Sequence, residues 1–254
     1  MREKKTIWLL AVALILPFAG LPVVRQLQDG LGVAGVASDQ YAVTILNVMT
    51  LFVLPLLIFM TASDMISGEL GDKTIRSVLS RPVSRTKIYA AKLIALFAHT
   101  AVLLALVFVA SEAAAFLLPD AGHAAASMGD AVLAYAASAL PLFVLCTAAA
   151  WVSLGFKNAS GALTVCILLY AAAKGLALVF PSYMVFSPVT YMNWHQLWLG
   201  GSIPEGRIFA ILSLLLGCGM VFYSTGHYFF DKKRSVGECI CRSASGSCCL
   251  IWRC

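Results

Sequence analysis

Charged residues are scarce in this sequence. Asp, Glu, Lys and Arg make up 12% of its 254 residues, and hydrophobic residues make up 61%. An ordinary soluble domain carries about 25% charged residues, so this scarcity excludes a soluble globular protein. The apolar segments follow one another so closely that we also expect no separate soluble catalytic domain within this length.

Motifs for bound cofactors are missing as well. The sequence contains no G-x-x-x-x-G-K-[ST] phosphate-binding loop, so we expect no ATPase site and no enzymatic activity in this chain. Its His, Cys, Asp and Glu residues do not cluster at the spacing of metal ligands, and we expect no metal site.

Apolar windows of about 20 residues dominate the chain, and each could cross the ~30 Å hydrocarbon core as a helix. They are Ile7–Val24, Tyr41–Ala62, Leu93–Leu118, Ala131–Phe156, Ala159–Phe180 and Ile208–Phe230. Lipid cannot satisfy backbone N–H and C=O groups, and the windows lack the alternation of barrel strands. The sequence therefore predicts an all-α membrane protein with about six transmembrane helices in one domain, residues 1–234.

Local signals refine the boundaries of these windows. Pro119 and Pro181 stand where helices should stop, and Asp130 can cap the N-terminus of the fourth window.

The basic residues fall on alternate sides of these windows. With a cytoplasmic N-terminus, the cytoplasmic side carries Arg2, Lys4, Lys5, Lys73, Arg76, Arg81, Arg85, Lys87, Lys92, Lys157, Lys232, Lys233, Arg234, Arg242 and Arg253, and the outer side only Arg25 and Arg207. The positive-inside rule then places both termini in the cytoplasm. The net charge of +6 thus reports topology, and we expect no nucleic-acid partner.

The segment before the last window differs from an ordinary loop. Ser187-Pro188 can start a helix and Gly200-Gly201 can stop it, while Tyr191, Trp194 and Trp198 share one face at spacings of three and four. This pattern predicts a short interfacial or re-entrant helix on the outer side. A simple interfacial aromatic belt would give the same pattern.

The C-terminal residues 235–254 carry five of the eight cysteines in a polar Ser/Gly segment. A cytoplasmic tail is in a reducing compartment, so a disulfide framework is not expected, and the cysteine spacing does not suit zinc. We interpret this Cys-rich tail as disordered or artefactual.

The stretch GELGDKTIRSVLSRPVSR, residues 68–85, interrupts the apolar sequence on the cytoplasmic side. Asp72 or Thr74 can cap a short helix that Pro82 ends, and Ile75, Val78 and Leu79 lie on one face of it. So small an amphipathic helix needs either the lipid interface or a groove on another protein to cover its apolar face.

This loop resembles a known family. The runs Asp64–Glu69 and Thr74–Tyr89, the lysine at position 92, the predicted six-span plan with its outer segment, and the ending Gly226–Lys233 are similar to type-2 ATP-binding-cassette (ABC) permeases. The resemblance implies the membrane subunit of an exporter, whose short loop helix is a coupling helix that docks on the ATPase. The implied contacts are Glu69, Thr74, Ile75, Arg76, Val78, Leu79 and Arg81.

The resemblance also implies partners. A separate cytoplasmic ABC ATPase would bind ATP and Mg²⁺, and two permease chains, identical or related, would form the pathway in a bacterial plasma (inner) membrane among its lipids. The sequence is also compatible with two other function classes: a membrane sensor or anchor that does not transport, and an intramembrane enzyme.

Two charged residues lie inside the apolar windows, where each costs roughly 2.5–3.5 kcal/mol at the bilayer centre. Glu112 and Lys174 each stand seven residues before a proline, Pro119 and Pro181, so both lie about 10 Å below the outer boundary. Equal depth predicts that they pair across the third and fifth windows. The alternative is that each side chain snorkels separately to the surface.

Overall fold

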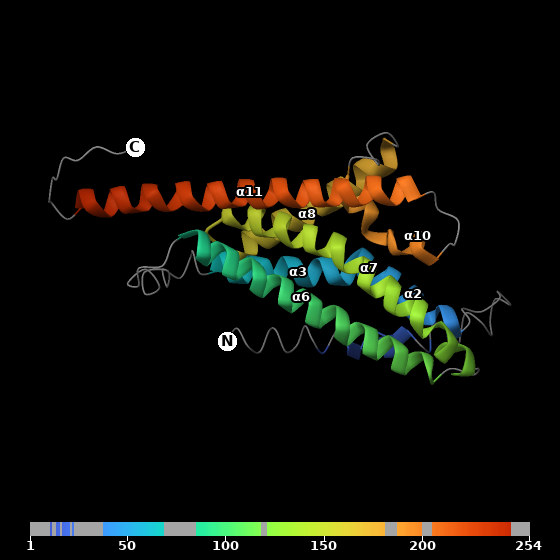
Figure 1. Cartoon of the computed structure of the whole chain (residues 1–254). Helices are drawn as coiled ribbons and strands as arrows, with labels where there is room; N and C mark the ends of the chain where they lie inside the picture. Colours follow the sequence, from blue (N-terminus) through green and yellow to red (C-terminus); the bar gives the residue numbers. More distant parts are fainter. Residues whose placement is uncertain are drawn as a thin grey trace.

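The computed structural model describes residues 11, 14–15, 17–20, 22, 38–68, 85–117, 121–180, 187–199 and 205–244. Every regular element in these ranges is helical, and the long helices lie side by side in one bundle (Figure 1). The elements are α2 (Ser38–Val48), the π-turn η1 (Met49–Val53), α3 (Leu54–Ser63), the π-turn η2 (Asp64–Gly68), α6 (Arg85–Ala115), α7 (Ala121–Leu154), α8 (Ala159–Val179), the 3-10 helix η3 (Pro188–Asn193), α10 (His195–Leu199) and α11 (Glu205–Ala244).

Five stretches of the described chain are long and apolar enough to cross a membrane. They are Tyr41–Gly68, Lys87–Ala115, Ser127–Leu154, Ala159–Ala177 and Gly206–Phe230. They agree with the last five predicted windows, which confirms the prediction of an all-α membrane protein. The first window, Ile7–Val24, lies largely outside the described residues, and those of its residues that are described are helical.

The bundle has two ends, which we name after residues that they contain. At the Ser67 end, η2 finishes, α6 begins, α7 finishes and α8 begins; at the Trp194 end, η3 and α10 connect α8 to α11. In Figure 1 the Ser67 end is on the left and the Trp194 end, with α10, is on the right.

One predicted boundary is wrong. The helix α7 begins at Ala121, so Asp130 lies inside it and does not cap its N-terminus. Four of the six residues 121–126 are Ala, which has the highest helix propensity. The helix therefore continues beyond the apolar window that was expected to define it.

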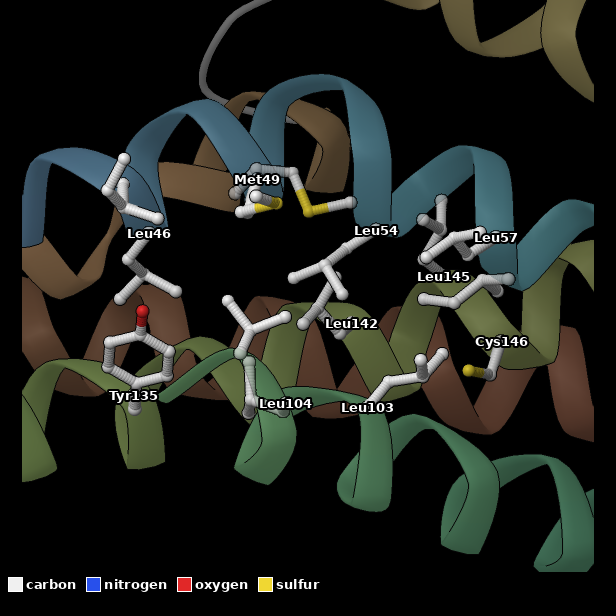
Figure 2. Packing of buried hydrophobic residues seen from close by; sticks show 14 of the residues in the cluster. Leu46, Met49, Leu54, Leu57, Leu103, Leu104, Tyr135, Leu142, Leu145 and Cys146 are labelled. Carbon is white, nitrogen blue, oxygen red and sulfur yellow. The ribbon is translucent and has the colours of Figure 1, made fainter. Parts of the chain in front are cut away.

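The centre of the bundle is α7, which packs against α2, α3, α6, α8, α10 and α11. Its buried residues Leu142, Leu145 and Cys146 meet Met49 of η1 and Leu103 of α6 in the main hydrophobic core (Figure 2). In the most apolar window of each span, 56% of the window is buried in α7, but only 11% in α8 and 11% in α11. The last two spans are therefore peripheral and turn most of their apolar surface outward.

A proline inside the span Tyr41–Gly68 leaves a backbone carbonyl that a side chain of α8 then binds. Pro55 lacks an N–H, so it cannot donate to the Leu51 carbonyl four residues earlier. The Tyr170 hydroxyl of α8 donates to that carbonyl instead, at 2.8 Å. The tyrosine thus supplies a hydrogen bond that the proline removes.

Candidate functional site

The predicted ATPase contacts fall on a loop whose two flanks are described. Glu69, Thr74, Ile75, Arg76, Val78, Leu79 and Arg81 all lie outside the described residues. The turn η2 leads into this loop, and α6 leads out of it. The anchorage of these two flanks is therefore the part of the candidate site that the structure describes.

The flank before the loop is attached to α7. The buried Ser67 hydroxyl of η2 donates a hydrogen bond to the Ser153 carbonyl, at 2.6 Å. Ser153 lies in the last turn of α7, where carbonyls lose the N–H partner four residues on. Such a bond contributes about 0.5–1.5 kcal/mol net, and it fixes the end of η2 on the central helix.

The flank after the loop is attached to the flank before it. The Lys92 ammonium of α6 donates to the Met65 carbonyl of η2, at 3.0 Å. Because the donor is charged, this hydrogen bond belongs to the stronger class, about 1.5–3 kcal/mol. This hydrogen bond holds the two flanks of the loop together, so the flanks should move as one unit when the loop is displaced.

Tyr89 connects the same flank to the last span. It is buried in a small cluster with Ile66, Leu93 and Phe230. Its hydroxyl lies against Gly226 of α11, where a Cβ atom would collide with it. Only glycine leaves room for this close approach, so Gly226 forms a notch that seats Tyr89 and joins α6 to α11.

At the Trp194 end, a second proline prepares an attachment point. Pro141 lies inside α7 and cannot donate to the Ala137 carbonyl four residues earlier. The Trp194 indole N–H donates to that carbonyl, at 2.7 Å. Trp194 is only 4% exposed, so it is a buried anchor of this segment on the central helix.

The other two predicted aromatics lie nearer the surface. Trp198 makes an edge-to-face contact with Trp194 at a centroid distance of 5.7 Å and is 45% exposed. Tyr191 is half-buried and packs against the cluster that contains Trp194. The helix begins at Pro188, as expected, and the interfacial role of these three residues stays a prediction.

Two amide hydrogen bonds, which the sequence did not indicate, also hold this segment. The Thr50 hydroxyl donates to the Asn193 side-chain oxygen at 3.2 Å, and the Gln196 amide donates to the Asn47 side-chain oxygen at 2.9 Å. These residues are more than 140 positions apart along the chain. No local spacing signals such pairs, so sequence reasoning missed them.

His195 lies between these attachment points and is fully buried. Among the residues that the structure describes, neither of its ring nitrogens has a partner at good hydrogen-bond geometry, and the Met192 backbone makes only a poor contact. Burial lowers the pKa of His195 to about 4, against a smaller opposite effect of the Met192 backbone. The imidazole is therefore neutral at pH 7, a state that an apolar environment favours.

Glu112 and Lys174 do not form an ion pair in the described structure. Glu112 is 8% exposed near the end of α6 and interacts electrostatically with Tyr135 of α7, whose hydroxyl is 2.8 Å from the Ser111 hydroxyl. Lys174 is half-buried on α8, which packs against α3 and α7. Functional coupling between the two charges stays a prediction. In the described part of the chain, no three His, Cys, Asp or Glu residues are placed to hold a metal ion.

Comparison with known proteins identifies one family. A sequence model described as ABC-2 family transporter protein matches residues 1–174. No curated protein matches the chain. The matched range includes the loop 69–84 with both of its flanks, and it ends within α8, before η3 and α10.

Proposed function

We propose, since the chain belongs to the ABC-2 family of transporter proteins, that it is the permease subunit of an exporter that a separate ABC ATPase drives. ATP and Mg²⁺ bind to that partner. Two permease chains, identical or related, form the pathway in the bacterial plasma membrane. Both termini and the loop 69–84 face the cytoplasm.

The anchorage of the loop flanks carries this proposal. Ser67 attaches one flank to α7, Lys92 joins the flanks, and Tyr89 seats the other flank against α11. A coupling helix needs such rigid connections, because ATPase closure must move whole spans rather than deform the loop. Three attachments to three different elements supply them.

The loop helix docks through two kinds of residue. Ile75, Val78 and Leu79 form its apolar face, which enters a groove on the ATPase. Polar contacts around that face come from the remaining predicted residues, Glu69, Thr74, Arg76 and Arg81.

A pair of neighbouring substitutions tests the docking face. Leu79→Asp places a charge on the apolar face and should abolish co-purification with the partner ABC ATPase. Ser80→Asp adds the same charge one position on, away from that face, and should leave the complex intact. Equal co-purification of both variants would contradict the docking assignment.

A second readout separates the exporter from a membrane sensor or anchor. Reconstitution of the permease with its ATPase should stimulate ATP hydrolysis, and the Leu79→Asp variant should not. A complex that forms without any stimulation would favour the sensor or anchor. Transport assays on that complex, over lipids, peptides and hydrophobic drugs, would then define the substrate.

A further inference from the structure

A cavity of about 150 Å³ lies among α3, α7, α8, η3 and α11. Phe59 of α3, Ala148 and Trp151 of α7, Leu169 of α8 and Phe222 of α11 are among its walls. None of the functions considered above uses this cavity.

The walls of the cavity suit an apolar ligand. The rings of Phe59 and Tyr170 meet edge to face at a centroid distance of 5.8 Å, and the ring centroids of Trp151 and Phe222 are 5.9 Å apart. The Tyr170 hydroxyl is engaged by the Leu51 carbonyl, so it does not offer the cavity a free donor. An apolar cavity on the order of 150 Å³ in another protein stays dry and binds benzene, and an acyl-chain segment meets the same chemical requirement.

The cavity opens toward the bilayer. Its walls on α8 and α11 come from two peripheral helices that pack against α7 but barely contact each other. Leu169 is 52% exposed at this side, and the neighbouring Leu168 is 62% exposed. Both helices span the membrane, so the medium at the opening is hydrocarbon.

The cavity also lies at the right depth for one leaflet. Trp151 is three residues from the end of α7, near the membrane boundary, whereas Leu169 is ten residues into α8, about 15 Å deep. Half of the hydrocarbon core is also about 15 Å thick. One acyl chain that starts at this boundary therefore reaches through the cavity.

A basic residue marks the place for the headgroup. Lys157 is exposed in the turn between α7 and α8, at most about 15 Å of chain from Trp151. A lysine at the membrane boundary attracts anionic lipid headgroups by about 1 kcal/mol. The charge of Lys157 thus complements a phosphate whose acyl chain lies in the cavity.

We propose that this cavity binds one acyl chain of an anionic phospholipid, from the leaflet that borders the α7–α8 turn, with the lipid phosphate at Lys157. The bound chain fills the gap between the two peripheral spans α8 and α11. The site is lateral to the bundle and does not depend on the ATPase partner, so its failure would leave the proposed export function untouched.

Photo-crosslinking tests the site directly. The full chain is reconstituted with phosphatidylglycerol that carries a diazirine near the middle of one acyl chain, and adducts are located by mass spectrometry. We expect adducts on residues 145–152 and 166–170. Ala148→Phe fills the cavity and should lower these adducts at least about five-fold, whereas adducts on the exposed α6 residues Ile94, Val102 and Val109 should not change.

Two further variants keep the test decisive. Ala148→Leu is a milder filling change and gives the same comparison if the Phe variant does not elute as a single species. Lys157→Gln changes an exposed side chain, and it should lower the cavity adducts of phosphatidylglycerol to the level that a phosphatidylcholine probe gives with the unmodified chain.

The proposal is overturned if filling the cavity lowers the α6 adducts as much as the cavity adducts, because the lipid contact is then unspecific. It is also overturned if the cavity gives no adduct while Leu169→Cys forms a disulfide between two chains. A second copy, rather than lipid, would then cover the opening.

Discussion

The two ends of the bundle are built differently. In the described residues, six buried side-chain polar atoms have no hydrogen-bond partner, and four of them belong to the Trp194 end: Ser187 Oγ, Thr190 Oγ1 and both ring nitrogens of His195. The Ser67 end has the other two, the Tyr89 hydroxyl and Ser153 Oγ. The end that flanks the loop is thus the better satisfied one.

This difference indicates different tasks. A buried polar atom without a partner costs about 1–3 kcal/mol, which is recovered when water reaches it. The Trp194 end therefore gains more from hydration than the Ser67 end does. In the exporter proposed above, the loop flanks are the rigid part that receives force from the ATPase, and the Trp194 end is the part that water reaches more readily.

The strongest test of the rigid end is to fill the Gly226 notch. Gly226→Leu should lower the stability by about 3 kcal/mol, because overpacking at Tyr89 displaces α11. Thermal unfolding in detergent should show a fall in Tm of roughly 6–12 °C. Gly217→Leu on the same helix is the control, since a Cβ atom there meets no atom within 4 Å. An equal fall in Tm for both variants would show that the contact between Tyr89 and Gly226 does not stabilise the protein.

An acid titration tests the less satisfied end. Burial lowers the folded-state pKa of His195 to about 4, below its unfolded value of about 6.5, so the unfolded chain binds the proton more readily. The stability from neutral His195 is fully present above pH 6.5 and is lost as the pH falls toward 4. We expect about 2 kcal/mol of loss between pH 8 and pH 5.

Chemical unfolding at these two pH values would measure the effect. His195→Leu should flatten the pH dependence. A pH slope that survives His195→Leu would show that acid sensitivity does not arise at the Trp194 end.

The smallest expected effect concerns the attachment of Trp194. Trp194→Phe leaves the Ala137 carbonyl unpaired, but in a Pro141→Ala background the new backbone N–H at position 141 can donate to it. The loss caused by Trp194→Phe should therefore shrink by about 1 kcal/mol in that background. Thermal unfolding of the four proteins measures this coupling, and strict additivity would contradict it. Trp198→Phe, which removes no bond to Ala137, should be additive.

Sequence reasoning found the spans because they are local. The predicted window Ala159–Phe180 and the observed span Ala159–Ala177 begin at the same residue, since a continuous apolar run specifies a membrane helix without any reference to its neighbours. The start of α7 was missed because alanines carry the helix past the apolar run.

Sequence reasoning placed the intramembrane charges on helices and predicted, from depth alone, that they pair. Glu112 and Lys174 stand at equal distances from Pro119 and Pro181, and this distance reports depth alone. The direction in which each helix turns its side chains depends on packing, and within the residues that the structure describes no ion pair joins Glu112 and Lys174. The prolines, in contrast, do indicate tertiary contacts. Pro55 and Pro141 each leave the carbonyl four residues earlier without its helical N–H donor, and a side chain far along the chain donates to that carbonyl instead.

The amino-acid pattern alone specifies a helical membrane protein, the positions of its spans and its family resemblance, because hydrophobic length and backbone hydrogen bonding are satisfied within each segment. The three-dimensional arrangement of the helices was needed to see which carbonyl Trp194 binds, that Tyr89 needs Gly226, and that α8 and α11 leave a cavity between them. These features depend on how helices rotate and approach one another, and that is set by packing between residues far apart in the chain.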